Sequence, residues 1–350
     1  MIRKTLFTLL SCTLTIGIFT GCATLAPHHA QAILGDSLVL AGSEPGALLH
    51  DSLRTGTVTV RNRYLPDQDG VIVYEEGTDY TVDYAAGTIA RTPNSRIPDY
   101  STNVLYGQKV FDHSKFPGYG NKPFFVFVDY TTRNASALTQ PTNQADRLPK
   151  TASTLRAGGT LNIIAYGDSI TAGGEATLLE LRFQQRYVAH LREQYPDATI
   201  QLENGATGGD ATRHGLKRLE EKVLSRNPDL VLMGFGMNDH NINGVPLEEF
   251  EDNLVSMVEQ IRDKTGAEVI LFSAFPPNPD WKHSAHRMEL YAAATERAAQ
   301  RTHSAYADVH AIWMKVLERK TPSSLLGNNI NHPNDFGHDL YYKGLKSVQF

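Results

Sequence analysis

The chain has 350 residues, of which 41% are hydrophobic, and carries 33 basic against 38 acidic side chains, a formal charge of −5. The length allows two domains, and the slightly acidic balance gives no reason to expect nucleic acid as a partner. The composition is typical of a globular protein and excludes a coiled-coil or low-complexity chain.

The N-terminal segment has the pattern of an export signal. Arg3 and Lys4 precede an apolar run over residues 5–21, which is too short and too close to the N-terminus to favour a membrane-spanning helix. The two cysteines are Cys12, inside this segment, and Cys22, directly after it. The mature protein is therefore expected to contain no disulfide and to depend on its hydrophobic cores.

Residues 19–22 (Phe-Thr-Gly-Cys) resemble a bacterial lipobox, in which the cysteine becomes the lipidated first residue, although Phe19 stands where leucine is usual. We therefore predict a lipoprotein signal peptide over 1–21 and an exported protein held at the membrane of the cell envelope by a lipid anchor on Cys22. An alternative cleavage site, Ala-Gln-Ala at 30–32, would give a soluble secreted or periplasmic protein, but it lies far beyond the apolar run.

A tether at 22–33 is expected to lead into an all-β domain over residues 34–130. Runs of β-branched and aromatic residues predict strands at 57–60, 71–74, 80–84, 88–90 and 124–130. Strands this short and closely spaced favour a small β-sandwich-like domain. Residues 131–160 contain no aromatic residue and three large aliphatic ones, which predicts a linker or a loop that lies over a domain surface.

From residue 161 to residue 350, apolar runs of strand length alternate with segments of helix length. The expected strands are 161–166, 199–203, 229–235, 268–274 and 304–309, and the expected helices are 178–195, 211–226, 247–265, 284–302 and 334–347. This alternation implies βαβ crossovers and a parallel sheet covered by helices on both faces. We therefore predict an α/β domain over residues 161–350.

Four short motifs lie at strand ends of this second domain. They are Gly-Asp-Ser-Ile at 167–170, Asn-Gly-Ala-Thr-Gly-Gly-Asp at 204–210, Gly-Met-Asn-Asp at 236–239 and His-Pro-Asn-Asp-Phe-Gly-His at 332–338. In this order they resemble the SGNH (GDSL-like) hydrolase family over roughly residues 161–347. The resemblance implies a flavodoxin-like three-layer α/β/α domain and hydrolysis of an acyl ester through an acyl-enzyme, with no metal or organic cofactor.

The resemblance also implies roles for single residues. Ser169 matches the nucleophile, and His332 matches the base that a serine hydroxyl needs at neutral pH. The backbone N–H groups of Ser169 and Gly209 and the side-chain amide of Asn238 match the donors that stabilise the oxyanion of the tetrahedral intermediate. Glycine permits close backbone approach, and asparagine donates without carrying charge.

One position departs from the family pattern. The family usually has aspartate three residues before the histidine, and this chain has Asn329 there. Three interpretations follow: Asn329 or a backbone carbonyl supports a Ser–His dyad, another acid such as Asp335 substitutes, or the site is impaired. We favour the first, with Asn329 orienting His332, because Asp335 should point along the following helix, away from the imidazole.

Several other residues invite a catalytic interpretation that we do not adopt. Residues 35–38 (Gly-Asp-Ser-Leu) copy the family's eponymous motif letter for letter, but no helix follows them and the other motifs do not follow at family spacing. Asp168, Asp210 and Asp239 are expected to hold turns and loops through hydrogen bonds to nearby N–H groups. His240 is expected to be a solvated loop residue.

These observations predict an exported serine esterase. An envelope location and an appended β-domain favour an O-acetylated carbohydrate as the substrate, and therefore a carbohydrate O-acetylesterase. A lipid esterase or thioesterase of the same family would share every catalytic residue. A non-catalytic glycan-binding envelope protein with a degenerate hydrolase domain is the alternative from another class, and transfer of the acyl group to a second sugar is a further variant.

Overall fold

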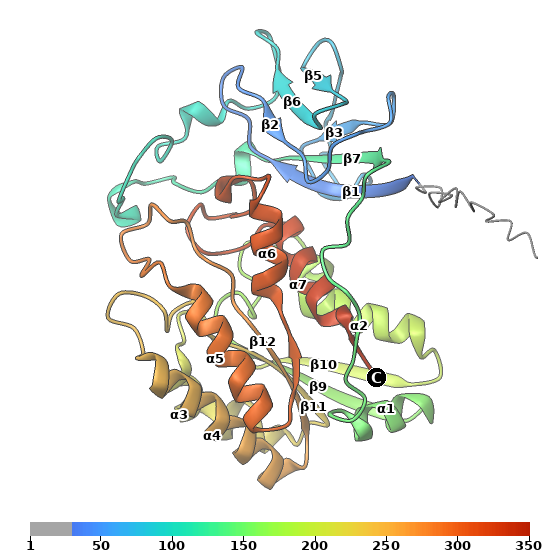
Figure 1. Ribbon diagram of the computed structural model, residues 1–350, viewed down its shortest axis with the longest axis vertical. Helices are drawn as coiled ribbons and strands as arrows, with labels where there is room; N and C mark the ends of the chain where they lie inside the picture. The colour runs from blue at the N-terminus through green and yellow to red at the C-terminus, as the bar shows by residue number, and fades with distance from the viewer. Residues whose placement is uncertain (1–29) are drawn as a thin grey trace, which may run out of the picture.

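The structure is a computed structural model, which describes residues 30–350. The predicted signal peptide and the lipid-anchor residue Cys22 lie outside these residues. The described chain forms a strand-rich N-terminal region that sits on one end of an α/β domain (Figure 1). Every helix in the described part of the chain is too short or too polar to span a membrane.

The strand-rich region consists of two small antiparallel sheets with a common core. The first contains, in spatial order, β1 (Gln31–Leu38), β7 (Val126–Thr132), β3 (Thr59–Arg61) and β4 (Val73–Tyr74). The second contains β2 (Gly46–Ala47), β6 (Thr88–Arg91) and β5 (Tyr80–Asp83). Leu48, Val60, Ile89, Val126 and Val128 are completely buried in the shared core.

Strand β1 begins earlier than expected. Gln31 and Ala32 pair with Thr132 and Thr131 of β7, so the predicted tether at 22–33 overlaps the sheet. Both side chains at this end of the strand are exposed, and for that reason no hydrophobic pattern marks them in the sequence.

The segment between β6 and β7 reaches from the strand-rich region to the α/β domain. It contains three short 3-10 helices, η1 (Tyr100–Thr102), η2 (His113–Lys115) and η3 (Lys122–Phe124). Leu105 and Phe111 of this segment pack with Trp281 and Ile330 of the α/β domain in a separate small apolar cluster. The two parts of the chain are therefore joined by packing as well as by their covalent connection.

The predicted linker at 131–160 is largely part of the folded structure. It contributes β8 (Thr142–Asn143), which pairs with β14 (Val348–Gln349) at the C-terminus, and helix α1 (Pro149–Arg156). The Glu268 carboxylate accepts hydrogen bonds from the first backbone N–H groups of α1, those of Lys150 and Thr151, both at 2.8 Å. The sequence pattern did not reveal α1 because a distant residue supplies its N-terminal cap.

The α/β domain confirms the predicted fold class. Its five strands are parallel in the order β10 (Thr199–Asn204), β9 (Thr160–Gly167), β11 (Leu230–Gly234), β12 (Glu268–Phe272) and β13 (Ala305–Ala307). This is the flavodoxin-like order 2-1-3-4-5, in which ligands bind at the carboxyl ends of the strands where the order reverses. That point lies between β9 and β11.

Helices cover both faces of this sheet (Figure 1). α3 (Thr212–Lys222), α4 (Leu247–Thr265) and α5 (Met288–Arg301) pack in sequence on one face, and α2 (Phe183–Gln194) packs with α7 (Asp335–Ser347) on the other. α6 (Val309–Leu317), which was not predicted, packs against α7. Three 3-10 turns, η4 (Leu179–Leu181), η5 (Leu224–Arg226) and η6 (Pro322–Ser324), complete the domain.

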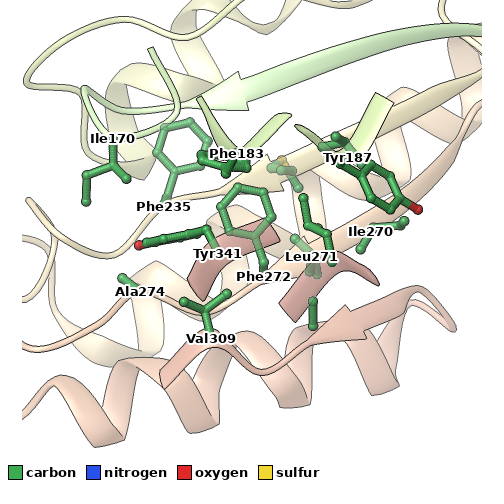
Figure 2. Close-up of a cluster of buried hydrophobic side chains, with 14 of the residues drawn as sticks. Ile170, Phe183, Tyr187, Phe235, Ile270, Leu271, Phe272, Ala274, Val309 and Tyr341 are labelled. Carbon is green, nitrogen blue, oxygen red and sulfur yellow. The ribbon is translucent and has the colours of Figure 1, made fainter. Parts of the chain in front are cut away.

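Aromatic residues join the helices to the sheet. The ring of Phe183 on α2 lies 5.4 Å from that of Phe272 on β12 and 5.1 Å from that of Tyr341 on α7, measured between centroids. Ile170 is buried at the edge of this cluster (Figure 2). Because Ile170 directly follows Ser169, the core anchors the turn that carries the proposed nucleophile.

Candidate active site

The first motif forms a tight turn at the end of β9. The Asp168 carboxylate accepts a hydrogen bond from the backbone N–H of Ile170 at 2.9 Å, and this bond closes the turn around Ser169. Gly167 is required by close packing, because a Cβ atom there would lie 2.2 Å from the carbonyl oxygen of Gly234 on β11. The Ser169 side chain is left half-buried at the switch point of the sheet.

Ser169 and His332 are brought together across 163 residues of sequence. The Oγ atom of Ser169 lies 2.7 Å from the Nε2 atom of His332, a hydrogen-bonding distance suited to proton transfer. Burial lowers the pKa of His332, and the charge of Glu175 opposes that effect. The imidazole is therefore neutral at neutral pH and able to accept the serine proton.

The loop that carries His332, residues 325–334 and called here the histidine loop, is held by its own asparagines. The side-chain oxygen of Asn328 accepts hydrogen bonds from the backbone N–H groups of Ile330, Asn331 and His332 at 2.9–3.0 Å. Asn334 caps α7 by accepting from the N–H of Gly337 at 2.9 Å. The proposed base is thus fixed just before the start of a helix that is anchored in the core.

The three proposed oxyanion donors lie on neighbouring loops. A Cβ atom on Gly208 would lie 3.9 Å from the Cβ of Ser169, so the second motif passes directly beside the proposed nucleophile. Gly209 has a φ of +80°, in the left-handed region that favours glycine. The Asn238 amide donates one N–H to the carbonyl oxygen of Asp210 at 2.9 Å, and its second N–H is suited to an oxyanion.

The neighbouring aspartates hold these loops in place. The Asp239 carboxylate accepts from the N–H and hydroxyl of Thr212, at 2.8 and 2.6 Å, and from the N–H of Gly236 at 3.1 Å. Asp210 forms an ion pair with Arg218. Burial raises the pKa of Asp168 to about 7 and that of Asp239 to about 6.

Two histidines near the motifs are buried. The expectation that His240 is solvated was wrong, because it is fully buried, with its Nδ1 atom 2.8 Å from the carbonyl oxygen of Met237. His338 stacks on Phe183, and its Nε2 atom lies 3.1 Å from the carbonyl oxygen of Gly174. Burial lowers the pKa of His338 to about 3, so this residue is neutral.

The expectation that Asn329 orients His332 is contradicted by the contacts of Asn329. Its side-chain oxygen accepts hydrogen bonds from the hydroxyl groups of Tyr100 and Ser323, both at 3.2 Å, and no bond joins it to His332 among the described residues. The backbone of Asn329 has a φ of +60°, and its side chain lies against Tyr100 of the strand-rich region. Asp335 does not substitute, because its carboxylate accepts from the N–H and hydroxyl of Thr177, both at 2.8 Å.

The strand-rich region supplies contacts to the histidine loop that the sequence did not reveal. Besides Tyr100, the fully buried Asn121 donates its side-chain amide to the carbonyl oxygens of Ser323 and Leu326, both at 3.0 Å. The Gly-Asp-Ser-Leu copy at 35–38 also lies at this interface, where the Ser37 hydroxyl donates to the carbonyl oxygen of Ser324 at 2.6 Å. The copy therefore has a structural role.

Two cavities between the strand-rich region and the α/β domain flank the histidine loop. The larger, of about 420 Å³, is lined by residues that include Tyr100, Tyr106, Gln108, Asn278 and Asn329. The smaller, of about 280 Å³, is lined by residues that include Tyr64, Lys122, Phe125, Glu175 and Gly327. Within residues 30–350, no group of three or more histidine, cysteine or acidic side chains is arranged to hold a metal ion.

The chain is similar in sequence to a known hydrolase family and to known esterases. The family model described as GDSL-like lipase/acylhydrolase matches residues 165–340, which include all four motifs. An arylesterase of Vibrio mimicus is 32% identical over 130 residues, and the alignment spans 37% of this chain and 62% of the relative. An acetylxylan esterase of Geobacillus stearothermophilus is 24% identical over 214 residues, or 56% of this chain and 97% of the relative.

Among solved structures, an acetylxylan esterase from Geobacillus stearothermophilus superimposes with a TM-score of 0.48 and 26% identity, over 54% of this chain and 94% of that chain. An α/β hydrolase from the metagenome of Lake Arreo superimposes with a TM-score of 0.46 and 23% identity, over 54% and 97% of the two chains. The family-model match begins at residue 165, and therefore leaves the strand-rich region outside it.

Proposed function

Because this chain belongs to the GDSL-like lipase/acylhydrolase family and is an ester hydrolase, we propose that it cleaves its substrate through an acyl-enzyme on Ser169. The observation that carries the proposal is the 2.7 Å approach of the Ser169 hydroxyl to Nε2 of His332, beside the loop that contains Gly209. A half-buried neutral imidazole next to a serine is the arrangement that activates the hydroxyl.

The reaction then runs in two steps. Ser169 Oγ attacks the ester carbonyl while His332 takes the hydroxyl proton, and the N–H groups of Ser169, Gly209 and Asn238 stabilise the oxyanion. The tetrahedral intermediate collapses as His332 gives its proton to the departing alcohol, leaving the acyl group on Ser169. Water, deprotonated by His332, attacks this acyl-enzyme, and the carboxylic acid leaves as the proton returns to Ser169.

We propose that the substrate is an O-acetylated carbohydrate. The cavity of about 420 Å³ next to the histidine loop presents the exposed side chains of Tyr106 and Gln108, although Ser169 and His332 are not among its lining residues. Aromatic faces and neutral hydrogen-bonding groups are suited to a sugar. An acetylxylan esterase among the relatives supports the same substrate class.

Acetate release from acetylated xylan, compared with p-nitrophenyl esters of increasing acyl length, tests this assignment. A carbohydrate O-acetylesterase releases acetate from the polymer and loses activity as the acyl chain of the model ester lengthens. A rate that rises with acyl length, with no acetate released from the polymer, would instead identify a lipid esterase. The Ser169→Ala variant supplies the background rate in both assays.

We also propose that the enzyme works at the cell envelope, anchored through a lipid on Cys22. The support for this location is the basic and apolar pattern of residues 1–21 and the lipobox-like residues 19–22. The Cys22→Ser variant of the full chain is expected to lose its lipid and to leave the membrane fraction. If wild type and variant are found in the same soluble fraction, the anchor proposal is wrong.

A further inference from the structure

His332 lacks the carboxylate that the family pattern leads one to expect. Asn329 has no negative charge and lies against Tyr100 and Ser323, while Asp335 is bound to Thr177. The imidazolium that forms when His332 takes the Ser169 proton needs a compensating charge in this half-buried setting. Another acidic residue near the imidazole would therefore have a clear chemical purpose.

The Nδ1 side of the imidazole faces the loop that follows the nucleophile. A Cβ atom on Gly174 would lie 3.3 Å from Nδ1 and 3.4 Å from Cε1 of His332, so the backbone of Gly174 lies directly against this edge of the ring. The N–H of Gly174 donates to the carbonyl oxygen of Ser169 at 2.9 Å, which fixes this backbone relative to the nucleophile. The next residue in the chain is Glu175.

The Glu175 side chain lies against the backbone of the histidine loop. A Cβ atom on Gly327 would lie 2.5 Å from the Cβ of Glu175 and 3.2 Å from its Oε2 atom. The N–H of Gly327, in turn, donates to the carbonyl oxygen of His332 at 2.9 Å. Glu175 is thus connected to His332 at two points. Its chain neighbour Gly174 lies against the imidazole, and its own side chain lies against Gly327, which is hydrogen-bonded to the carbonyl oxygen of His332.

The backbone of Glu175 is unusual. Its φ of +67° is in the left-handed region, which a non-glycine residue seldom adopts. Such conformations persist where the surrounding structure enforces them, and they are concentrated at functional sites. In this conformation the partly buried Glu175 carboxylate lies near Lys122 and against Gly327 of the histidine loop.

Several elements bring charged groups near this site, among them Arg182, whose side chain packs against Gly173, the residue before Gly174. Lys122 of the strand-rich region lies with its Nζ atom 3.5 Å from Oε2 of Glu175. His338, on α7, is neutral, and the Asp335 carboxylate is occupied by Thr177. The negative charge of Glu175 opposes the lowering of the His332 pKa by burial.

We propose that Glu175 is the positioning carboxylate of His332, and that it replaces, from the serine loop, the acid missing from the histidine loop. It acts through His332, by stabilising the positive charge at the Nδ1 edge while Nε2 carries the serine proton, and it does not itself take a proton. Lys122 partly neutralises this charge. A residue of the strand-rich region therefore reduces the basicity of His332. This inference rests on the proposed function of Ser169 and His332.

The test is the pH dependence of kcat/KM for p-nitrophenyl acetate in Glu175→Gln. Removing the negative charge is expected to lower the plateau roughly tenfold, which corresponds to about 1.4 kcal/mol, and to shift the rising limb downward by about half a pH unit or more. Glu175→Asp should restore much of both. Glu180→Gln, an exposed glutamate on the same segment, is the matched control and should change neither quantity.

A second variant shifts the limb in the opposite direction. Lys122→Met removes the cation that attenuates Glu175, so the rising limb is expected to move to higher pH, more at low ionic strength than at high. If Glu175→Gln lowers the plateau of kcat/KM but leaves the rising limb at the same pH, Glu175 has a structural role only. If the variant changes neither quantity, Glu175 has no role in the reaction. Either result would overturn the inference.

The pKa of His332 can also be measured without turnover. In Ser169→Ala, the imidazole resonance of His332 is expected to titrate at lower pH once Glu175→Gln is added. This measurement separates the two proposals: an inactive wild type removes the proposed function, whereas an active wild type with an unmoved His332 titration removes only the role of Glu175.

Discussion

Tyr100 donates its hydroxyl hydrogen bond to the side-chain oxygen of Asn329 across 3.2 Å, and this contact joins the strand-rich region to the loop that carries His332. Both residues are buried, with relative exposures of 6% and 1%. Asn329 stands where the family usually has the acid of the triad, and here it serves as an attachment point for the strand-rich region. That region is consequently part of the framework of the candidate active site.

Converting Asn329 to the family's usual aspartate is expected to bring no gain in activity. The new carboxylate in Asn329→Asp would face Tyr100 and Ser323 instead of the imidazole, and its buried charge would lower the free energy of unfolding by about 1–3 kcal/mol. Urea unfolding and kcat/KM measure the two effects. Asn243→Asp, an exposed asparagine that also has a positive φ, is the control. A clear rise in kcat/KM for Asn329→Asp would contradict this description of the site.

Removing the Tyr100 hydroxyl should weaken both the fold and the reaction. Tyr100→Phe leaves the ring packing and deletes one hydrogen bond to Asn329, so the free energy of unfolding should fall by about 1 kcal/mol, with a lower kcat. Tyr106→Phe is the matched control, because Tyr106 packs edge-on against Tyr100 but is about half exposed. If Tyr100→Phe and Tyr106→Phe change the free energy of unfolding and kcat by the same amounts, the contact with Asn329 does not support His332.

The buried ion pair between the strand-rich region and the α/β domain is expected to be the contact between them that contributes most to the free energy of unfolding. The Nζ atom of Lys320 lies 2.7 Å from the carboxylate of Asp36, with both side chains fully buried. Lys320→Met leaves Asp36 as an unpaired buried charge and should lower the free energy of unfolding by about 3–5 kcal/mol. Lys109→Met, which removes the exposed partner of Asp280, should have little effect. A loss in Lys320→Met no larger than in the control would refute this.

The activity of the wild type should already be near its maximum at neutral pH. Burial holds the pKa of His332 below its usual value of 6.5, and only the neutral imidazole accepts the serine proton. The rate therefore rises with pH through a midpoint below 6.5 and then levels off. A profile of kcat/KM against pH, with the fold monitored over the same range, checks this. A midpoint above 7 would mean that charge stabilisation by Glu175 outweighs burial.

Much of the α/β domain could be predicted because its signals are local. Apolar runs mark β9 to β13, and α4 has the predicted bounds, since the periodicity of a helix is contained in its own sequence. The four motifs are likewise short, and the first three lie at the ends of strands that could be recognised. Strand order then brings Ser169 and the loop of Gly209 together.

The features that were missed depend on distant partners. The orientation of Asn329 is set by a positive φ and by Tyr100, which lies 229 residues away in the sequence. Helix α1 depends on Glu268, and Asn121 supports the histidine loop from a segment with no recognisable motif. Glu175 carries no motif either, and its left-handed backbone is the one local peculiarity, visible only in three dimensions.

The proposed acyl-enzyme on Ser169, activated by His332, can be detected by p-nitrophenyl acetate turnover combined with intact-mass analysis of the quenched enzyme. We expect turnover in the wild type with one acetyl group on Ser169, and neither turnover nor adduct in Ser169→Ala. Wild-type turnover no greater than that of Ser169→Ala, on acetate and on a longer acyl ester, would contradict it.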